Sequence, residues 1–195
     1  LPVNCEIPLV VSLHATKTLG VGEGSLVISR NQDFILNFKK RTNFGFWGSR
    51  NSLLVGTNAK LSEYVAAVGL AALDNWLIKK KQWEVTRDNY LRHEKQLNLK
   101  KIKYFGFSRD WVSSYCHVLF EDPKQLILAK NNLAKKEIES RSWWSEGCHK
   151  HFSMQSYAKA KLTETRKLGE LSLGIPFHTK LKDEEIGFIC NIICE

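Results

Sequence analysis

Short apolar runs open the chain and predict two strands. IPLVVSL and GSLVIS are rich in β-branched residues, and each is typical of a buried strand. NQDFILNFKKR follows and predicts a helix with Asn31 as its N-cap and with Phe34, Ile35 and Phe38 facing inward. A Gly/Asn/Ser-rich loop over residues 42–58 comes next. A loop of that length in a compact domain is usually either functional or disordered.

Longer helical patterns and one alternating strand fill the rest of the chain. LSEYVAAVGLAALDNWLI predicts a close-packed helix, and KKKQWEVTRDNYLRHEKQL continues it with more polar residues. Because the composition shifts near Trp76–Lys81, we expect two domains, 1–76 and 77–195. SSYCHVLFED alternates as a strand. DPKQLILAKNNLAKKEI predicts a helix with Asp122 as N-cap and Pro123 in its first turn, and TETRKLGELSLGI and DEEIGFICNIIC predict two more helices. This order predicts an α/β part followed by a smaller α+β part.

Composition and charge narrow the class of protein. With 43% apolar and 25% charged residues, and no apolar run near the roughly 20 residues that span a bilayer, we expect a soluble globular protein without a membrane partner. The net charge of +9 favours anionic partners such as nucleic acid, an acidic surface or phosphorylated small molecules; the spread of the lysines is also typical of a solvated surface. The five cysteines form no CxxC pair, which indicates neither a disulfide framework nor a zinc ribbon and favours a reducing, cytoplasmic setting. Cys190 and Cys194 lie four apart, so we expect both to pack in the core.

The stretch SLHATKTLGVGEG combines groups that covalent cofactor chemistry can use. Lys17 follows Ser12 by five residues and runs into Gly20, Gly22 and Gly24. A lysine can attack a carbonyl once it is neutral, a serine hydroxyl can donate to a phosphate oxygen, and glycines allow a tight turn beside a bulky group. The stretch could therefore hold a phosphorylated aldehyde. From the residues alone, a lysine in a surface turn after a strand remains the alternative.

Five motifs in order resemble one enzyme family. SLHATK followed by GVGEG is similar to the S-x-H-x-x-K…GEG signature of the DegT/DnrJ/StrS sugar aminotransferases. TNFGF and GTNAKLSEYVAAVGLAAL resemble the family's Asn-x-Gly region and its G-x-N-x-R-M-x-E segment, and SRSWW…CHKH and LGELSLGIPFHTKLKDEEI resemble its aromatic…His loop and C-terminal segment. The resemblance implies an α/β fold: the C-terminal part of a fold-type I transferase dependent on pyridoxal 5'-phosphate (PLP), with a remnant of the large mixed-sheet domain in 1–76 and a small α+β domain in 77–195.

The resemblance also implies roles for individual residues. Lys17 would link covalently to PLP and move the proton, Ser12 would hold the cofactor phosphate, and His14 would lie beside the cofactor without a proton-transfer role. Asn58 would reach the phosphate of the neighbouring subunit's cofactor, because the family's active sites form across a homodimer. A sister group of sugar dehydratases has histidine at the lysine position, so Lys17 favours transamination. The implied reaction moves an amino group from an amino acid, usually glutamate, to a keto-sugar nucleotide in polysaccharide or sugar biosynthesis.

The CHKH loop has two possible uses. The resemblance places it near the sugar-nucleotide pocket, where Trp144 and His149 would contact the substrate; an ordinary packed loop is the alternative. Cys148, His149 and His151 offer potential metal ligands, but no second cluster completes a tetrahedral site, so we expect no metal.

The sequence also departs from the family pattern. GEGG is GEGS here, with Ser25 in place of a glycine, and the Arg-Met pair after Asn58 is Lys60-Leu61, which loses the bidentate fork of arginine. The resemblance begins just before Lys17, whereas the family's front half supplies an acidic partner for the pyridine nitrogen, a stacked ring and phosphate donors. We therefore expect uncovered strand edges and apolar faces, and an incomplete paralogue without activity of its own stays an alternative.

A basic nucleic-acid-binding module is a further alternative. Phe44, Phe46 and Trp47 with Arg50 could stack on bases, but a single-strand groove needs several such platforms and only this loop offers one.

Overall fold

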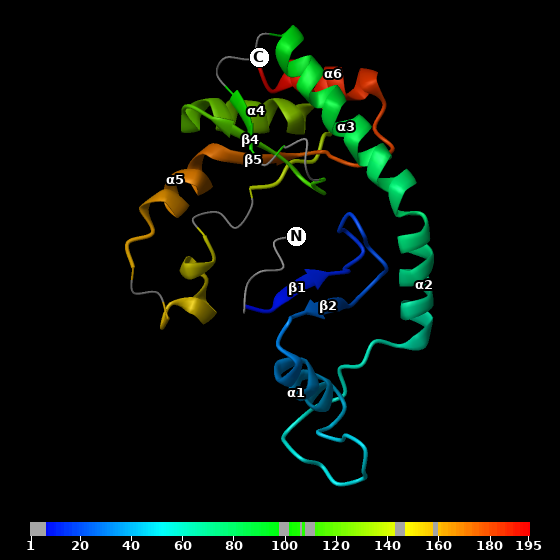
Figure 1. The fold of residues 1–195 in the computed structure, drawn as a ribbon. Helices are drawn as coiled ribbons and strands as arrows, with labels where there is room; N and C mark the ends of the chain where they lie inside the picture. Colours follow the sequence, from blue (N-terminus) through cyan, green and yellow to red (C-terminus); the bar gives the residue numbers. More distant parts are fainter. Residues whose placement is uncertain (1–6, 98–101, 106, 108–111, 143–146, 158–159) are drawn as a thin grey trace. The chain divides into compact units, whose positions relative to one another are not determined.

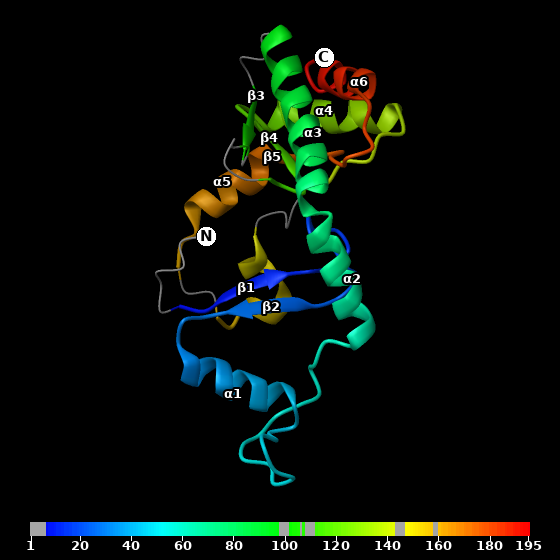
Figure 2. The same ribbon diagram turned by 45° about the vertical axis from the view of Figure 1, so that its right-hand side comes forward.

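The computed structural model describes residues 7–97, 102–105, 107, 112–142, 147–157 and 160–195. The chain divides into two compact units, Leu1–Leu77 and Ile78–Glu195. Each unit is described by itself below, and both are drawn in Figures 1 and 2. That these units are part of a large cofactor domain and a small domain stays a prediction.

The first unit begins with a hairpin and continues with helices. Strand β1 (Leu9–Ser12) pairs antiparallel with β2 (Ser25–Ile28), so that Ser12 lies opposite Ser25. Helix α1 (Gln32–Thr42) begins where the sequence predicted, because the Asn31 side chain accepts a hydrogen bond from the Phe34 N–H at 2.9 Å.

A second helix of the first unit follows the long loop. Helix α2 (Glu63–Asp74) is capped at its start by Ser62 and at its end by Asn75. Helix α3 (Trp76–Gln96) starts at the next residue, so the helical region that the sequence predicted as continuous is two helices.

The first unit has almost no buried core. Among its described residues, Leu13 is the one buried apolar side chain, at 4% exposure. Val10 on β1 is 64% exposed, α1 buries no residue, and Phe38 is exposed. The predictions of buried strands, an inward-facing α1 and a close-packed α2 were therefore wrong about burial. The apolar pattern is present, but no described element covers it.

The predicted loop over residues 42–58 is closed by its own backbone. Asn43 and Asn58 form an antiparallel bridge, and the Thr57 N–H donates to the Arg41 carbonyl at 2.7 Å. Gly45 has a φ of +84°, and a Cβ there would stand 1.9 Å from the Leu54 carbonyl oxygen, so only glycine fits. The loop is thus a folded feature that fixes the backbone of Asn58.

The second unit is built on a three-stranded antiparallel sheet in the order β3-β4-β5. The strands are β3 (Ile102–Phe105), β4 (Cys116–Phe120) and β5 (Ser172–Ile175). The helices of this unit after α3 are α4 (Pro123–Lys135), α5 (Thr163–Leu171) and α6 (Asp183–Ile192), with short 3₁₀ turns η1 (Cys148–Lys150) and η2 (Phe152–Met154). Helices α3, α4 and α6 lie on the same side of the sheet, as the two views show (Figures 1 and 2).

A single apolar core holds the second unit together. Cys116, Val118 and Phe120 alternate into it from β4, as the sequence predicted. Helix α4 also begins as predicted, with the Asp122 side chain accepting from the Lys124 N–H at 2.7 Å. The other buried members come from α3, β3, α4, β5, α6 and the residue after α6: Tyr90, Ile102, Leu126, Ala129, Leu133, Leu173, Ile175, Ile186, Ile189, Cys190, Ile192 and Ile193.

Two predictions about this unit need correction. TETRKLGELSLGI is not one helix: α5 ends at Leu171, and Ser172–Ile175 is a strand, because Leu173 pairs with Val118 and is fully buried. Cys190 is buried as predicted, but Cys194 is exposed.

Buried hydroxyl and thiol groups should make the second unit sensitive to alkali. The Tyr90 hydroxyl donates to the Pro176 carbonyl at 2.5 Å, and the Tyr104 hydroxyl lies 3.2 Å from the Cys190 sulfur. Burial raises the pKa of both tyrosines and of the Cys116 thiol, and raises the pKa of the Cys190 thiol to about 11. The folded state therefore holds these protons more tightly than the unfolded chain does.

We expect the free energy of unfolding of the second unit to fall as pH rises above about 9. The stabilising contribution is complete below the unfolded-state pKa, about 8.5 for cysteine and 10 for tyrosine, and is lost toward the folded-state pKa at about 1.4 kcal/mol per pH unit for each group. Urea unfolding followed by circular dichroism at pH 7.5, 9 and 10 would measure this. Cys190→Ser keeps a hydrogen-bonding group without a titratable thiol, so the unfolding free energy of this variant should fall less steeply with pH. An unfolding free energy that stays constant from pH 7.5 to 10 in the unsubstituted protein would contradict the prediction.

Candidate functional site

The connection between β1 and β2 is a closed turn that carries Lys17. The Leu13 N–H donates to the Gly24 carbonyl and the Val21 N–H to the Leu13 carbonyl, both at 2.9 Å. At the tip, the Lys17 N–H donates to the His14 carbonyl at 2.9 Å, and the Gly20 N–H donates to the Lys17 carbonyl at 3.0 Å. The side chain of Lys17 is half-buried. The turn therefore fixes the lysine backbone on both sides.

Glycines are needed for the shape of this turn. Gly22 and Gly24 have φ angles of +115° and +141°, which residues with a side chain rarely adopt. A Cβ at Gly20 would stand 2.4 Å from the Ala15 carbonyl oxygen. The glycines predicted to allow a tight turn thus occupy the positions at which the backbone requires them.

Ser12 and His14 lie on the same turn as Lys17. The Ser12 hydroxyl oxygen accepts a hydrogen bond from the His14 N–H at 3.3 Å, which leaves its proton for another acceptor, and the residue is exposed. The His14 ring is contacted on both sides: Nδ1 lies 2.9 Å from the Thr16 hydroxyl, and Nε2 lies 3.4 Å from the Glu23 carboxylate. The sequence reasoning missed the contact with Glu23, although the GEG motif placed an acid there.

Asn58 lies in the first unit, at the base of the closed loop. The residue is exposed, and its backbone is bridged to Asn43. The Lys60 ammonium donates to the Asn43 side-chain oxygen at 2.8 Å and lies 5.0 Å from the centre of the Phe44 ring. Lys60, which stands where the family has arginine, therefore contacts the loop over residues 42–58. Its position in the sequence did not indicate this contact.

The predicted substrate contacts belong to the second unit. His149 is half-buried in η1, and its Nε2 atom is buried without a hydrogen-bond partner among the described residues. Gly147, at a φ of +107°, lies against Thr165 of α5, where a Cβ would stand 2.5 Å from the Thr165 methyl carbon. Trp144 lies outside the described residues. No group of three His, Cys, Asp or Glu that could hold a metal ion occurs in the described part of the chain.

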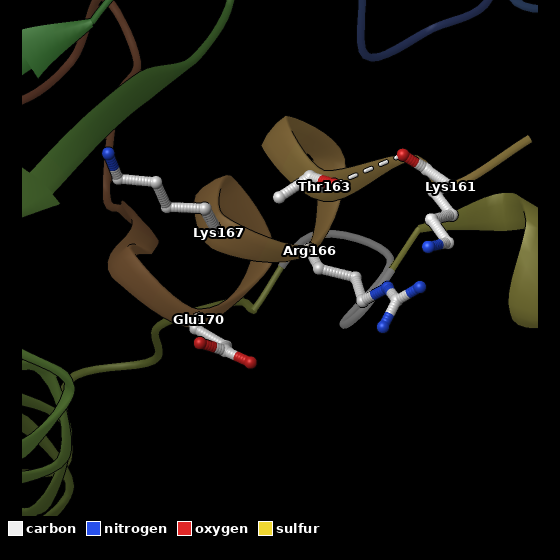
Figure 3. Close-up of a pocket in the computed structure, with 5 residues that line it drawn as sticks. All are labelled: Lys161, Thr163, Arg166, Lys167 and Glu170. Atoms are coloured by element: carbon white, nitrogen blue, oxygen red, sulfur yellow. Dashed lines mark hydrogen bonds between the residues drawn. The ribbon is translucent and has the colours of Figure 1, made fainter.

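Helix α5 borders a hollow of about 430 Å³ that the sequence did not indicate. It is lined by Lys161, Thr163, Arg166, Lys167 and Glu170. Figure 3 shows Lys161 and Arg166 extending to the same side while Lys167 points away, and the Thr163 hydroxyl donates to the Lys161 carbonyl at 3.2 Å. None of the site residues predicted from the sequence lines this hollow.

The structure thus brings part of the predicted site together. Ser12, His14 and Lys17 share one turn, Asn58 lies elsewhere in the same unit, and His149 lies in the other unit. A lysine, a hydroxyl with a proton to donate and a glycine turn fit the aldehyde carbon and the phosphate of PLP. The carboxylate closest in sequence, Glu23, contacts His14. None of the helices in the described part of the chain combines the length and apolar character needed to cross a bilayer.

Comparison with known proteins identifies relatives over almost the whole chain. A model of the DegT/DnrJ/EryC1/StrS aminotransferase family matches residues 8–194. Protein Rv3402c of Mycobacterium tuberculosis is 28% identical over 203 residues, which cover 98% of this chain and 46% of that protein.

Solved structures agree with this match. A Bacillus cereus protein assigned as a PLP-dependent aminotransferase aligns with a TM-score of 0.88 and 28% identity, over 96% of this chain and 51% of that one. DesI, solved in the presence of its TDP-sugar product, aligns with a TM-score of 0.82 and 26% identity, over 95% of this chain and 48% of that one. The predicted family and α/β fold class are confirmed, and the chain spans about half the length of the relatives it matches.

Proposed function

The chain belongs to the DegT/DnrJ/EryC1/StrS aminotransferase family, and from that premise we propose that it forms part of a PLP-dependent sugar aminotransferase. The proposed reaction transfers an amino group from an amino acid, with glutamate as the donor, to the keto carbon of a nucleotide-linked sugar. Its product would enter polysaccharide or sugar biosynthesis in the cytoplasm. The alternative of a nucleic-acid-binding module is not favoured, because the family match extends over residues 8–194.

The observation that carries this proposal is the closed turn that places Lys17 just beyond the Ser12 end of β1. A half-buried lysine whose backbone is hydrogen-bonded on both sides presents its amine from a fixed position. Lysine rather than histidine at this position supports transamination. In the site that we propose, Lys17 would hold PLP through its Nζ atom and, once released by the amino donor, would carry the proton on the same atom.

The other residues would bind and orient the cofactor. Bound PLP supplies an electron sink that permits nitrogen transfer between an amino acid and a ketone. The Ser12 hydroxyl, which already accepts from the His14 N–H, has its proton free to donate to the cofactor phosphate. His14 is held by Thr16 and Glu23 and serves as a positioned neighbour without a proton-transfer role. Asn58, fixed through Asn43, would reach the phosphate of the partner cofactor in a homodimer.

The substrate class follows from charge and from a relative. DesI was solved with a TDP-sugar product, and the net charge of +9 in this chain suits a ligand that carries a diphosphate. Trp144 and His149 are the side chains that we propose for substrate contact.

The test is direct transfer of labelled nitrogen. The protein is incubated with PLP, glutamate labelled at its amino nitrogen, and a thymidine-diphosphate-linked keto sugar. We expect 2-oxoglutarate and an amino sugar carrying the label, both detected by mass spectrometry. Omission of PLP is the control. Labelled amino sugar that forms equally without PLP, or no amino sugar from any of several keto-sugar nucleotides despite PLP bound at Lys17, would contradict the proposed reaction.

A further inference from the structure

Helix α5 carries an arginine that no described carboxylate neutralises. The other described arginines of the second unit each pair with a carboxylate: Arg87 with Asp88, Arg92 with Asp183, and Arg141 with Glu139. Arg166 forms no ion pair with a described residue, although Glu170 follows it by four residues, a spacing at which opposite charges on a helix can meet. The guanidinium of Arg166 is therefore available to an anion from outside the chain.

A second cation extends to the same side as Arg166. We call the space lined by Lys161, Thr163, Arg166, Lys167 and Glu170 the α5 hollow. In Figure 3, Lys161 and Arg166 extend to the same side, whereas Lys167 points away. All five lining residues are exposed and lie within residues 161–170 of the second unit. The hollow is thus formed within one short segment of one unit.

The charge of the α5 hollow selects an anion of more than one charge. Its lining holds three cations and one carboxylate, that of Glu170. A phosphate monoester carries roughly −1.5 to −2 at pH 7, which matches Lys161 and Arg166 together, whereas a carboxylate would bring a single charge. Arginine donates two parallel hydrogen bonds to phosphate oxygens, and lysine adds a point charge. The Thr163 hydroxyl already donates to the Lys161 carbonyl, so the two cations supply the recognition.

The size of the α5 hollow fits more than a free phosphate ion. Its volume of about 430 Å³ lies in the range of about 300–1,000 Å³ that is typical of small-molecule sites. No aromatic side chain is among its lining residues, so it offers no platform on which a flat ring could stack. The lining therefore favours a hydrophilic ester, such as a sugar phosphate.

We propose that the α5 hollow is a binding site for a phosphorylated polar small molecule of the sugar phosphate class, whose phosphate lies between Lys161 and Arg166. Glu170 opposes binding of this anion and limits its affinity. The site shares no residue with the candidate cofactor and substrate contacts, and the inference does not depend on the proposed aminotransferase function.

Nuclear magnetic resonance of the nitrogen-15-labelled, 195-residue chain tests the site with glucose 6-phosphate as the probe. We expect amide shifts that saturate and that are largest within residues 161–170, and no such shifts with glucose. Arg166→Gln should weaken binding about tenfold, because it removes a charge-assisted, bidentate contact. Arg166→Lys keeps the charge without the fork and should weaken binding about threefold. Arg166 is exposed, so neither variant should alter the circular dichroism spectrum.

Two further variants separate the hollow from the general positive charge of the protein. Lys167→Ala removes the same charge from the same helix, but this side chain points away, so the dissociation constant should change by less than about twofold. Glu170→Gln removes the carboxylate from the lining and should tighten binding by about two- to threefold.

Three results would overturn the proposal. Equal weakening by Arg166→Gln and Lys167→Ala would mean that net charge, and not the hollow, attracts the ligand. Equal shifts with glucose and with glucose 6-phosphate would mean that the phosphate is not recognised. Shifts that do not saturate by about 20 mM, or that spread evenly over the exposed lysines of the second unit, would mean that no defined site exists.

Discussion

Alanine in place of Lys17 is expected to abolish covalent retention of PLP and to lower transamination by at least about a thousandfold. The amine of Lys17 is the nucleophile of the proposed site, and the turn gives it a fixed backbone. Neither Ser12 nor His14 can replace it, because a hydroxyl and an imidazole do not form the same bond to the aldehyde carbon. The measurement is borohydride treatment of the protein with PLP, followed by peptide mass mapping of the modified lysine.

Lys167→Ala is the matched control for this experiment. Lys167 is an exposed lysine of α5 in the second unit, and its removal should leave PLP retention unchanged. Retention in Lys17→Ala at the level of the unsubstituted protein, or a modified peptide that contains another lysine, would show that the turn does not hold the cofactor. If Lys17→Ala loses PLP while its circular dichroism spectrum is unchanged, the loss comes from the missing amine and not from unfolding.

Local features of the fold could be predicted from the sequence because their causes are local. Asn31 and Asp122 each accept a hydrogen bond from a backbone N–H two or three residues further on, so the residue type alone places the start of the helix. The alternation in SSYCHVLFED predicted the strand that is now β4, since successive side chains of a strand point to opposite sides, but it did not say which side is buried.

Burial could not be predicted, because it depends on what else is present. IPLVVSL has the composition of an interior strand, yet Val10 is exposed, since no described element covers the hairpin. The strand Ser172–Ile175 was missed because the helix before it extends up to Leu171 and the sequence gives no sign of a change there. Pairing of Leu173 with Val118 overrides the local helical preference.

In the candidate site, too, features that are local in sequence could be predicted, whereas contacts between distant residues could not. Ser12, Lys17 and the glycines lie close in sequence, so their motif could indicate a shared turn. The contact between His14 and Glu23 and the hydrogen bond from Lys60 to Asn43 depend on how the chain folds back, and the motif gave no sign of either.

Backbone amides of the second unit should exchange their hydrogens more slowly than those of the first unit, by about three orders of magnitude or more. Strands β3, β4 and β5 and helix α4 pack around one apolar core. Exchange of their amides should therefore require unfolding of the second unit. Amides of β1 and β2 are held by a hairpin with one buried apolar side chain nearby, so local opening should expose them at little cost in free energy. Exchange followed by peptide mass spectrometry on the 195-residue chain measures both.

A matched pair of substitutions tests the cause of that difference. Val118 is fully buried in β4 and Val10 is 64% exposed in β1. Val118→Ala should cost about 1–3 kcal/mol and speed exchange throughout the second unit by roughly tenfold for each 1.4 kcal/mol. Val10→Ala should change exchange in the first unit by less than about twofold, because the lost methyl groups were already in water. Similar protection of β1 and β4, or equal effects of the two substitutions, would contradict the assignment of this difference to the exposed apolar side chains of the first unit.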